Sequence, residues 1–461
     1  MIRSYKYTFF AIKVKFSEYN MGKIELMAVD SQFARVVAQL LENGFSEEEL
    51  AYGVKVPSDT SVECERIGNK KLHQRLPIQS GMKYVLLNDR GEEVGEPKTI
   101  SDMNGEKGQV MVKIPGHYYK FIDGEDGSRE VWLSEFSLKG YEYVPDMYVS
   151  AFEASIDRER NCLASVVNKS ARYRGGDNKS EWDNTYRTLL GRPITNKSLN
   201  EFRTLARNRS IGDASWNCQT YEAYRNLYWL FVVEYATLNS QKEYNPELSE
   251  DGYHQGGLGM GATTLTGNEW GAFNGTEPIL ACGSTIGDKI SADTVVKTVI
   301  VQDDASFKKE ISVASYRGVE NIFGHVWKFM DGAIATRSGG HSIGNISVIL
   351  QSDKSKYSEY DEYDIDLGQT LPKEEGVGYK HFFGEDGDIF PTMVQSDLKK
   401  GFCDYYFSDN SVTEDTTHVF LTGGTVTDGA SAGLTCMMNS ALPEDADLIV
   451  GTRLCYIPKD K

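Results

Sequence analysis

Cysteine and proline are both scarce in this sequence, and their scarcity excludes several architectures. The 461 residues include only 12 prolines, too few for Pro-rich linkers. The seven cysteines are scattered along the chain and contain no C-x-x-C pair. This odd, scattered set argues against a disulfide framework or a zinc site, and it predicts mostly buried free thiols in a protein made in a reducing compartment.

The sequence also lacks an excess of basic residues and any long apolar run. The formal net charge is −18 at pH 7, and no basic stripe offsets it, so we expect no nucleic-acid partner. The longest apolar run, Leu227–Val233, is a fraction of a membrane span, which predicts no membrane insertion. Near the start, Thr8–Ile12 is too short for a signal peptide and is followed by Lys13 and Lys15.

Acidic residues gather in two stretches, Ser358–Asp366 and Glu385–Asp388. Neither has the spaced oxygen ligands of an EF-hand loop, and solvated loops are the favoured interpretation. We expect no cofactor, and leave a structural calcium ion open for these stretches.

The N-terminal 120 residues divide into two predicted parts. Residues 1–60 form a helical attachment segment, with helices at Ala34–Glu42 and from Ser46 onward. Residues 61–120 form a small β-rich domain. Its predicted strands are Leu76–Ile78, Lys83–Leu87, Val110–Ile114 and Tyr118–Phe121.

Residues 121–461 form the third predicted domain, which begins with a strand near 144–152 and contains two helices. Thr220–Asn239 carries an aromatic stripe at helical spacing that we assign to the core. In the helix Ser198–Asn208, Phe202 and Leu205 point inward, whereas the arginines Arg203, Arg207 and Arg209 do not. A glycine-rich loop at 251–290 and short strands follow, so the fold class is α+β.

Two stretches resemble the C-type lectin fold of the formylglycine-generating-enzyme type. Gly318–Gly332 reads GVENIFGHVWKFMDG, which is similar to the family pattern EN-x-x-G-N-V-W-E-W-x-x-D. The end of the chain combines Gly423-Gly424, a second glycine-rich turn at 429–434, and Gly-Thr-Arg-Leu at 451–454. The resemblance implies a C-terminal lectin-like domain whose Arg453 ties the last strand to the acidic segment near Asp331.

Much of the chain from residue 62 onward also resembles large proteins of Bacteroidales phages and prophages. Segments such as Arg66–Asn69, Gly108–Pro115 and Tyr148–Ala154 carry this likeness. Members of that group resemble variable proteins of diversity-generating retroelements, which are related to the phage major tropism determinant. The resemblance implies a receptor-binding protein on the virion surface or tail, made in the host cytoplasm without a signal peptide.

Enzymatic activity is not expected. The copper-binding cysteine pair of formylglycine-generating enzymes has no counterpart, because Cys403, Cys436 and Cys455 are widely spaced. The seven histidines are isolated, and no nucleophile–base arrangement stands out.

We expect ligand-binding loops at 400–440. This region combines aromatic anchors with adaptable hydrogen-bonding side chains, the mixture found in paratopes. The predicted ligand-binding residues are Tyr405, Tyr406, Ser408, Asn410, His418, Thr425, Thr427, Asp428, Met437 and Asn439. The alternative is that the aromatic residues at 405, 407 and 420 belong to the strand core.

The predicted function is therefore non-enzymatic, adhesin-like binding of a bacterial cell-surface glycan or protein. Other virion proteins are expected partners, and a homotrimer is expected because phage fibres are commonly trimeric. The alternatives are a structural virion decoration or fibre protein, or a formylglycine-generating-type oxidase.

Overall fold

The computed structural model is β-rich and describes residues 46, 49–59, 61–176, 179–185, 187–248, 250, 252, 254, 278–302, 308–338, 345–380, 387–395, 404–408 and 416–459. The helices predicted at Ala34–Glu42 and from Ser46 onward fall almost wholly outside these residues. None of the described helices is long and apolar enough to cross a membrane.

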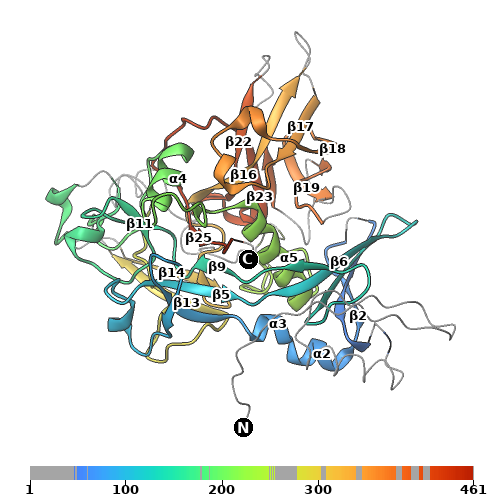
Figure 1. The fold of residues 1–461 in the computed structure, drawn as a ribbon, viewed down its shortest axis with the longest axis horizontal. Helices are drawn as coiled ribbons and strands as arrows, with labels where there is room; N and C mark the ends of the chain where they lie inside the picture. The colour runs from blue at the N-terminus through green and yellow to red at the C-terminus, as the bar shows by residue number, and fades with distance from the viewer. Residues whose placement is uncertain are drawn as a thin grey trace.

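Two antiparallel sheets form the lower layer in Figure 1. The first runs in the order β2 (Glu65–Gly68), β1 (Tyr52–Val56), β7 (Arg129–Ser134), β6 (His117–Asp123) and β8 (Glu142–Val144). The second runs β12 (Trp216–Cys218), β25 (Leu454–Tyr456), β9 (Met147–Ser150), β5 (Gln109–Ile114), β3 (Lys83–Leu87) and β4 (Glu93–Gly95). In this second sheet, β25 lies between two strands that precede it by more than two hundred residues.

A nine-stranded sheet forms the upper layer (Figure 1). Its order is β18 (Ile365–Leu371), β17 (Asn345–Leu350), β16 (Trp327–Ser338), β22 (Thr417–Gly423), β23 (Gly433–Ala441), β21 (Tyr405–Phe407), β19 (Gly376–Lys380) and β20 (Met393–Gln395), with β24 (Val450–Gly451) paired to β16. Smaller sheets are β10 (Ser155–Asp157) with β11 (Cys162–Ala164), and β13 (Val295–Gln302) with β14 (Lys308–Tyr316) and β15 (Val319–Glu320).

Two longer helices lie among these sheets, close to their predicted positions. The first, α4, spans Leu199–Arg207, and a reciprocal capping box between Ser198 and Glu201 starts it. The second, α5, spans Tyr221–Tyr235 and starts at Thr220, whose hydroxyl accepts from the amide of Ala223 at 3.2 Å. Because α5 contacts β1 and β9 on one side and β16 on the other, it joins the two layers.

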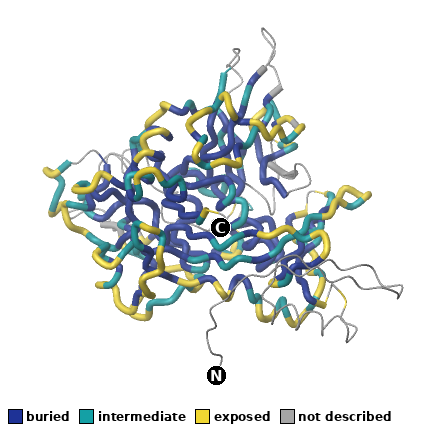
Figure 2. The backbone as a smooth tube through the Cα atoms, in the orientation of Figure 1, coloured by how far each residue is buried: buried dark blue, intermediate teal, exposed yellow. Residues whose placement is uncertain are grey.

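The aromatic stripe of α5 is core, as predicted. Tyr221, Tyr224, Leu227, Tyr228, Phe231 and Val232 are all buried. They share one cluster with residues of β1, β5 and β9 below and of β16, β22 and β23 above. Figure 2 shows the buried backbone running through the centre of the molecule.

The predicted strand at Leu76–Ile78 is wrong. Residues Lys70–Arg75 form α2, and Pro77–Ser80 form the short helix α3. Leu76 has a left-handed conformation (φ 45°) that ends α2, and Pro77 then occupies the first turn of α3, a position that suits its fixed φ and missing amide hydrogen.

The sheets extend across both predicted domain boundaries. β1 pairs with β2 across residue 60, and the boundary at residue 120 falls inside β6. β5 pairs with β9, which in turn pairs with β25 at the end of the chain. Residues 61–120 therefore share their sheets with residues on both sides.

The predicted free thiols agree with the structure within the described residues. Cys162, Cys218, Cys282, Cys436 and Cys455 are buried and unbridged, and Cys64 is half-buried. Burial raises the pKa of both Cys64 and Cys455 to about 12, so these thiols are protonated and unreactive at neutral pH.

The central position of α5 leads to a stability prediction. Phe231→Ala removes a ring that is 1% exposed, so we expect the free energy of unfolding to fall by about 3–5 kcal/mol. Ile211→Ala, at a side chain that is 92% exposed, is the control and should change it by less than about 0.5 kcal/mol. Thermal denaturation followed by circular dichroism measures both, and equal losses would contradict the assignment of α5 to the core.

Candidate ligand-binding site

The motif at 318–332 supplies buried structural contacts. Glu320 is 2% exposed, and its carboxylate accepts from the amide of Gly283 at 3.0 Å and from the amide and hydroxyl of Thr285, each at 2.6 Å. Burial raises the pKa of Glu320, and the hydrogen bonds from Thr285 oppose this shift. Glu320 thereby fixes the C-terminal part of the glycine-rich loop.

His325 belongs to a buried polar cluster with Glu153 and Lys328. Its Nδ1 donates to the Glu153 carboxylate, while Nε2 accepts from the amides of Ile279 at 3.2 Å and Leu280 at 3.4 Å. These contacts give His325 a structural role.

Lys328 balances the charge of Glu153. Its Nζ lies 2.9 Å from Glu153 Oε1, and both side chains are almost fully buried. Burial alone would raise the pKa of Glu153, but the contacts with His325 and Lys328 outweigh burial and lower it to about 2. The cluster connects the segment after β9 with the start of β16.

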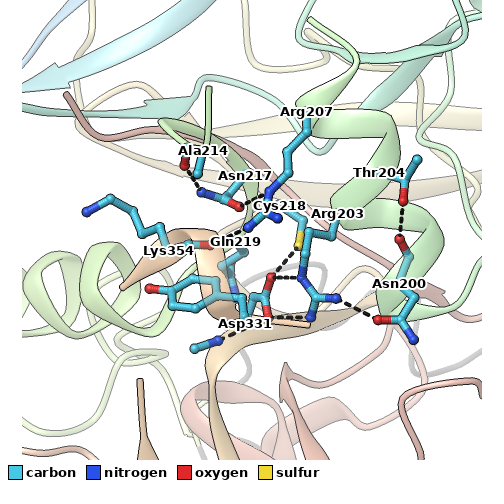
Figure 3. Close-up of polar contacts among 12 residues, drawn as sticks. Asn200, Arg203, Thr204, Arg207, Ala214, Asn217, Cys218, Gln219, Asp331 and Lys354 are labelled. Carbon is cyan, nitrogen blue, oxygen red and sulfur yellow. Dashed lines mark hydrogen bonds and ion pairs between the residues drawn. The ribbon is translucent and has the colours of Figure 1, made fainter. Parts of the chain in front are cut away.

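Asp331 forms the second buried ion pair of the motif (Figure 3). Its two oxygens accept from Nε and Nη2 of Arg203, both at 2.8 Å, and neither side chain is more than 3% exposed. Asn200 accepts from Nη1 of the same arginine at 2.6 Å, and the Cys218 thiol donates to Asp331 at 3.6 Å. This bidentate pair connects α4 to β16.

The arginines of α4 and its end were predicted to point away from the core, and this is wrong for two of them. Arg203 and Arg209 are 3% and 4% exposed. Arg209 donates to the Leu163 carbonyl and pairs with Asp89 at 2.7 Å. Arg207 is half-buried and donates to Asn217 at 3.2 Å (Figure 3).

Arg453 does tie the last strands to the motif, but through different atoms from those predicted. Its guanidinium donates to the backbone carbonyls of Ser150, Glu320 and Asn321. The carboxylate of Asp331 is occupied by Arg203. By donating to these carbonyls, Arg453 connects β9 and β15 with β25, the strand that follows it.

The ten predicted ligand-binding residues fall into groups of different exposure. Six are buried, namely Tyr406, Ser408, His418, Thr425, Met437 and Asn439. Tyr405 and Asp428 are half-buried and Thr427 is exposed. Asn410 lies outside the described residues. Buried side chains cannot touch a ligand in this conformation, so we assign those six to the scaffold.

Some of the buried predicted residues come together at one end of the nine-stranded sheet. The Asn439 amide donates to the Tyr406 hydroxyl at 2.5 Å, and that hydroxyl donates to the Pro372 carbonyl at 3.2 Å. Arg337 donates to Asn439 at 3.5 Å. On neighbouring β22, His418 Nδ1 donates to the Ser440 carbonyl at 3.0 Å. These contacts connect β16, β21, β22 and β23 near the C-terminal end of β23.

The other predicted residues lie at the opposite end of β23, in the turn that joins it to β22. Asp428 accepts from the amide and hydroxyl of Thr425 at 2.6 and 3.0 Å, and burial raises its pKa. Gln241 Nε2 donates to carbonyls of the same turn, including Gly429 at 3.0 Å. Since β23 separates this turn from Asn439 by about 20 Å of strand, the predicted residues do not form one site.

A row of partly exposed side chains remains on β21 and β23. Phe407 and Met438 lie opposite each other in the parallel register, and both are half-buried. The ring of Tyr405 stacks at a tilt against Phe407, with centroids 4.5 Å apart, and Trp327 supports Phe407 from the core at 5.6 Å. We call Tyr405, Phe407, Met438 and Ser440 the outer row.

Sequence reasoning missed Glu153, Lys328 and Asp404. The first two have a detectable signal, since each is a lone charge inside an apolar run, a pattern that indicates a buried, paired charge. Asp404 is 1% exposed and accepts from the amide and hydroxyl of Thr435, each at 2.8 Å. Burial raises its pKa to about 7, and the bonds from Thr435 only partly oppose this.

The acidic stretches and the histidines offer no metal centre in the described part of the chain, where no three His, Cys, Asp or Glu side chains gather. In the first acidic stretch, Glu362 pairs with Lys356 at 2.6 Å. In the second, Asp388 is buried and accepts from the Tyr221 hydroxyl. Glu385 lies outside the described residues.

Comparison of the sequence with protein-family models and with curated proteins gives no match.

The buried pair Arg203–Asp331 predicts a strong stability effect. Asp331→Asn keeps the shape of the side chain but leaves the guanidinium charge unbalanced, so unfolding should become easier by about 3–5 kcal/mol. Lys83→Met is the matched control, because the pair Lys83–Glu96 is exposed and should contribute less than about 1 kcal/mol. In urea denaturation, the double variant Arg203→Met with Asp331→Asn should be more stable than Asp331→Asn alone. If the destabilising effects of the two single variants simply add, the two residues are not directly coupled.

Asp404 predicts a pH dependence of stability. Its pKa is raised from 3.8 to about 7, so the folded state holds this proton more tightly than the unfolded state. The free energy of unfolding should therefore rise as pH falls from about 7 to about 4. Above about pH 7 the Asp404 carboxyl is ionised in both states, and its burial has its full destabilising effect. Asp404→Asn should raise the melting temperature more at pH 8 than at pH 5, and an equal change at both would contradict the assignment.

Proposed function

We propose that this chain is a non-enzymatic receptor-binding protein of a phage virion surface or tail, and that the part of the chain from β9 to β25 has a C-type-lectin-like fold. Two arrangements support the lectin-like proposal. β9 near the start of this region pairs with β25 at its end, and α4 and α5 lie between them in the sequence. The motif residues Glu320 and Asp331 also occupy buried, fully bonded positions that suit a structural signature.

The observation that carries the binding proposal is the contrast between the scaffold and the outer row. Around the row, polar side chains such as Asn439 and His418 are used in internal hydrogen bonds. The row itself offers two aromatic rings, a thioether and a hydroxyl that are only half covered. Rigid aromatic anchors lose little conformational entropy on binding, which makes such a row a suitable contact surface.

The ligand class that we propose is a glycan or protein on a bacterial cell surface. Tyr405 and Phe407 can stack against sugar rings or pack against apolar side chains, and Ser440 can exchange hydrogen bonds with either. Thr427 lies in the turn at the other end of β23 and is not part of this contact surface, and Asn410 lies outside the described residues. A homotrimer and attachment to other virion proteins belong to the same proposal.

Binding to whole cells tests this proposal. The purified full chain, labelled with a fluorophore, is incubated with a panel of Bacteroidales strains and measured by flow cytometry. If the outer row makes the contact, Tyr405→Ala should weaken binding at least tenfold, as expected for an aromatic hot spot worth about 2 kcal/mol.

Two controls make the result interpretable. Ile211→Ala changes an exposed side chain outside the row and should leave binding intact. Thermal denaturation verifies that Tyr405→Ala is folded. Binding that is unchanged in Tyr405→Ala and Phe407→Ala, or no binding to any strain, would refute the proposal.

A further inference from the structure

The first sheet has two faces with different surroundings. Successive residues of a strand point to opposite faces, and Val131 and Leu133 of β7 point into the core cluster around α5. The residues on the other face, which we call the outer face, are Trp132 of β7, Tyr118, Lys120 and Ile122 of β6, and Tyr143 of β8.

The chain that leads into β1 covers part of this outer face. Trp132 is 8% exposed and belongs to a small cluster that includes Leu50. The Leu50 carbonyl accepts from the Ser134 hydroxyl at 2.8 Å, and Ser134 lies directly opposite Tyr118 in the strand register. The chain therefore enters the sheet over its outer face, one strand away from Tyr118 and two strands away from Tyr143.

The neighbouring part of the outer face is aromatic and partly open. Tyr143 is 59% exposed, and its ring centroid lies 5.1 Å from that of the half-buried Tyr118. Tyr141 is also half-buried, and the Lys120 ammonium lies 5.5 Å from the centroid of its ring. We call Tyr118, Tyr141 and Tyr143 the tyrosine patch.

The sequence just before Ser46 supplies an apolar surface that needs a partner. Apolar residues recur at spacings of three and four in and beside the predicted helix Ala34–Glu42, namely Phe33, Val36, Val37, Leu40 and Leu41. Such residues form a stripe along one side of a helix, and Arg35 and Gln39 fall on the other side. A helix of this length is marginal in water by itself, so it depends on burying its stripe.

The connection between this predicted helix and the sheet is short. The four steps along the chain from Glu42 to Ser46 span at most about 14 Å. The chain then turns at once, because the Glu49 amide donates to the Ser46 carbonyl at 3.1 Å and the Ser46 amide donates to the Glu49 carboxylate at 2.7 Å. Strands lie about 4.8 Å apart, which puts Tyr143 about 10 Å from Ser134. A helix about 14 Å long that ends near Ser46 can therefore reach the tyrosine patch.

A second group of exposed apolar side chains lies elsewhere. Val295, Val296 and Ile300 of β13 are 36%, 45% and 54% exposed. Figure 1 shows β13 on the other side of β5 and β9 from β2 and β6. The short connection to Ser46 holds the predicted helix at the end of the lower layer that contains the tyrosine patch.

We propose that the predicted helix Ala34–Glu42 packs its apolar stripe on the tyrosine patch of its own chain. The stripe covers the exposed ring of Tyr143 and extends the small cluster around Trp132. This contact ties the N-terminal segment to the first sheet, at a place separate from the outer row. It goes beyond the proposed receptor contact and does not depend on it. A second copy of the chain is the other occupant that the test distinguishes.

Photo-cross-linking of the purified full chain tests this contact. Tyr143 is replaced by photoreactive p-benzoyl-phenylalanine, and the illuminated products are separated on denaturing gels and mapped by mass spectrometry. We expect a product of monomer size in which position 143 is joined to a peptide within residues 33–42. Leu40→Asp should lower its yield about tenfold or more, because a carboxylate is not tolerated in an apolar contact. Gln39→Asp, on the polar side of the helix, is the matched control and should leave the yield unchanged.

Two further positions of the photoreactive residue make the result interpretable. At Ile211, which is 92% exposed and lies outside the patch, it should give no product with residues 33–42. At Tyr141 it repeats the test if thermal denaturation shows that the change at Tyr143 disturbs folding. Products of dimer size alone would assign the patch to a second copy and overturn the proposal. Absence of a product with residues 33–42 from both patch positions would also overturn it, as would equal yields in Leu40→Asp and Gln39→Asp.

Discussion

The structure depends on charges that are buried and balanced. Asp331 meets Arg203 in a two-point pair, and Glu153 is held between His325 and Lys328, so segments far apart in sequence are fixed to β16. An unbalanced charge at any of these places would be costly in the interior, so arrangements of the strands that leave one of these charges unpaired are disfavoured. Apolar packing around α5 forms one large core cluster that contains residues of both layers.

The side chains of β21, β22 and β23 likewise divide into two sets. One set, with Tyr406, Asn439 and His418, faces inward and bonds within the sheet. The other set, the outer row, rests on this bonded layer and on Trp327. Exchange of residues in the outer set would leave the inner bonds intact, as the proposed contact surface requires.

Local features could be predicted from the sequence, and long-range ones could not. The helix α5 and the strands β3 and β5 follow from hydrophobic periodicity, which acts over a few residues. The direction of Arg203 could not be predicted, because it depends on a carboxylate that lies 128 residues away. The separation of the predicted ligand-binding residues between the two ends of β23 could not be predicted either. It depends on how the strands pair, which local composition does not determine.

The place of β25 in its sheet has a consequence for how the protein is made. This strand is translated after the other five strands of the sheet, yet it lies between β12 and β9 and completes their hydrogen bonding. Until it leaves the ribosome, the sheet is divided, and the edges of β12 and β9 have unpaired backbone amides and carbonyls. Closure of this sheet therefore waits until β25 has been made, and a nascent chain that stalls before residue 454 exposes the edges on which aggregation begins.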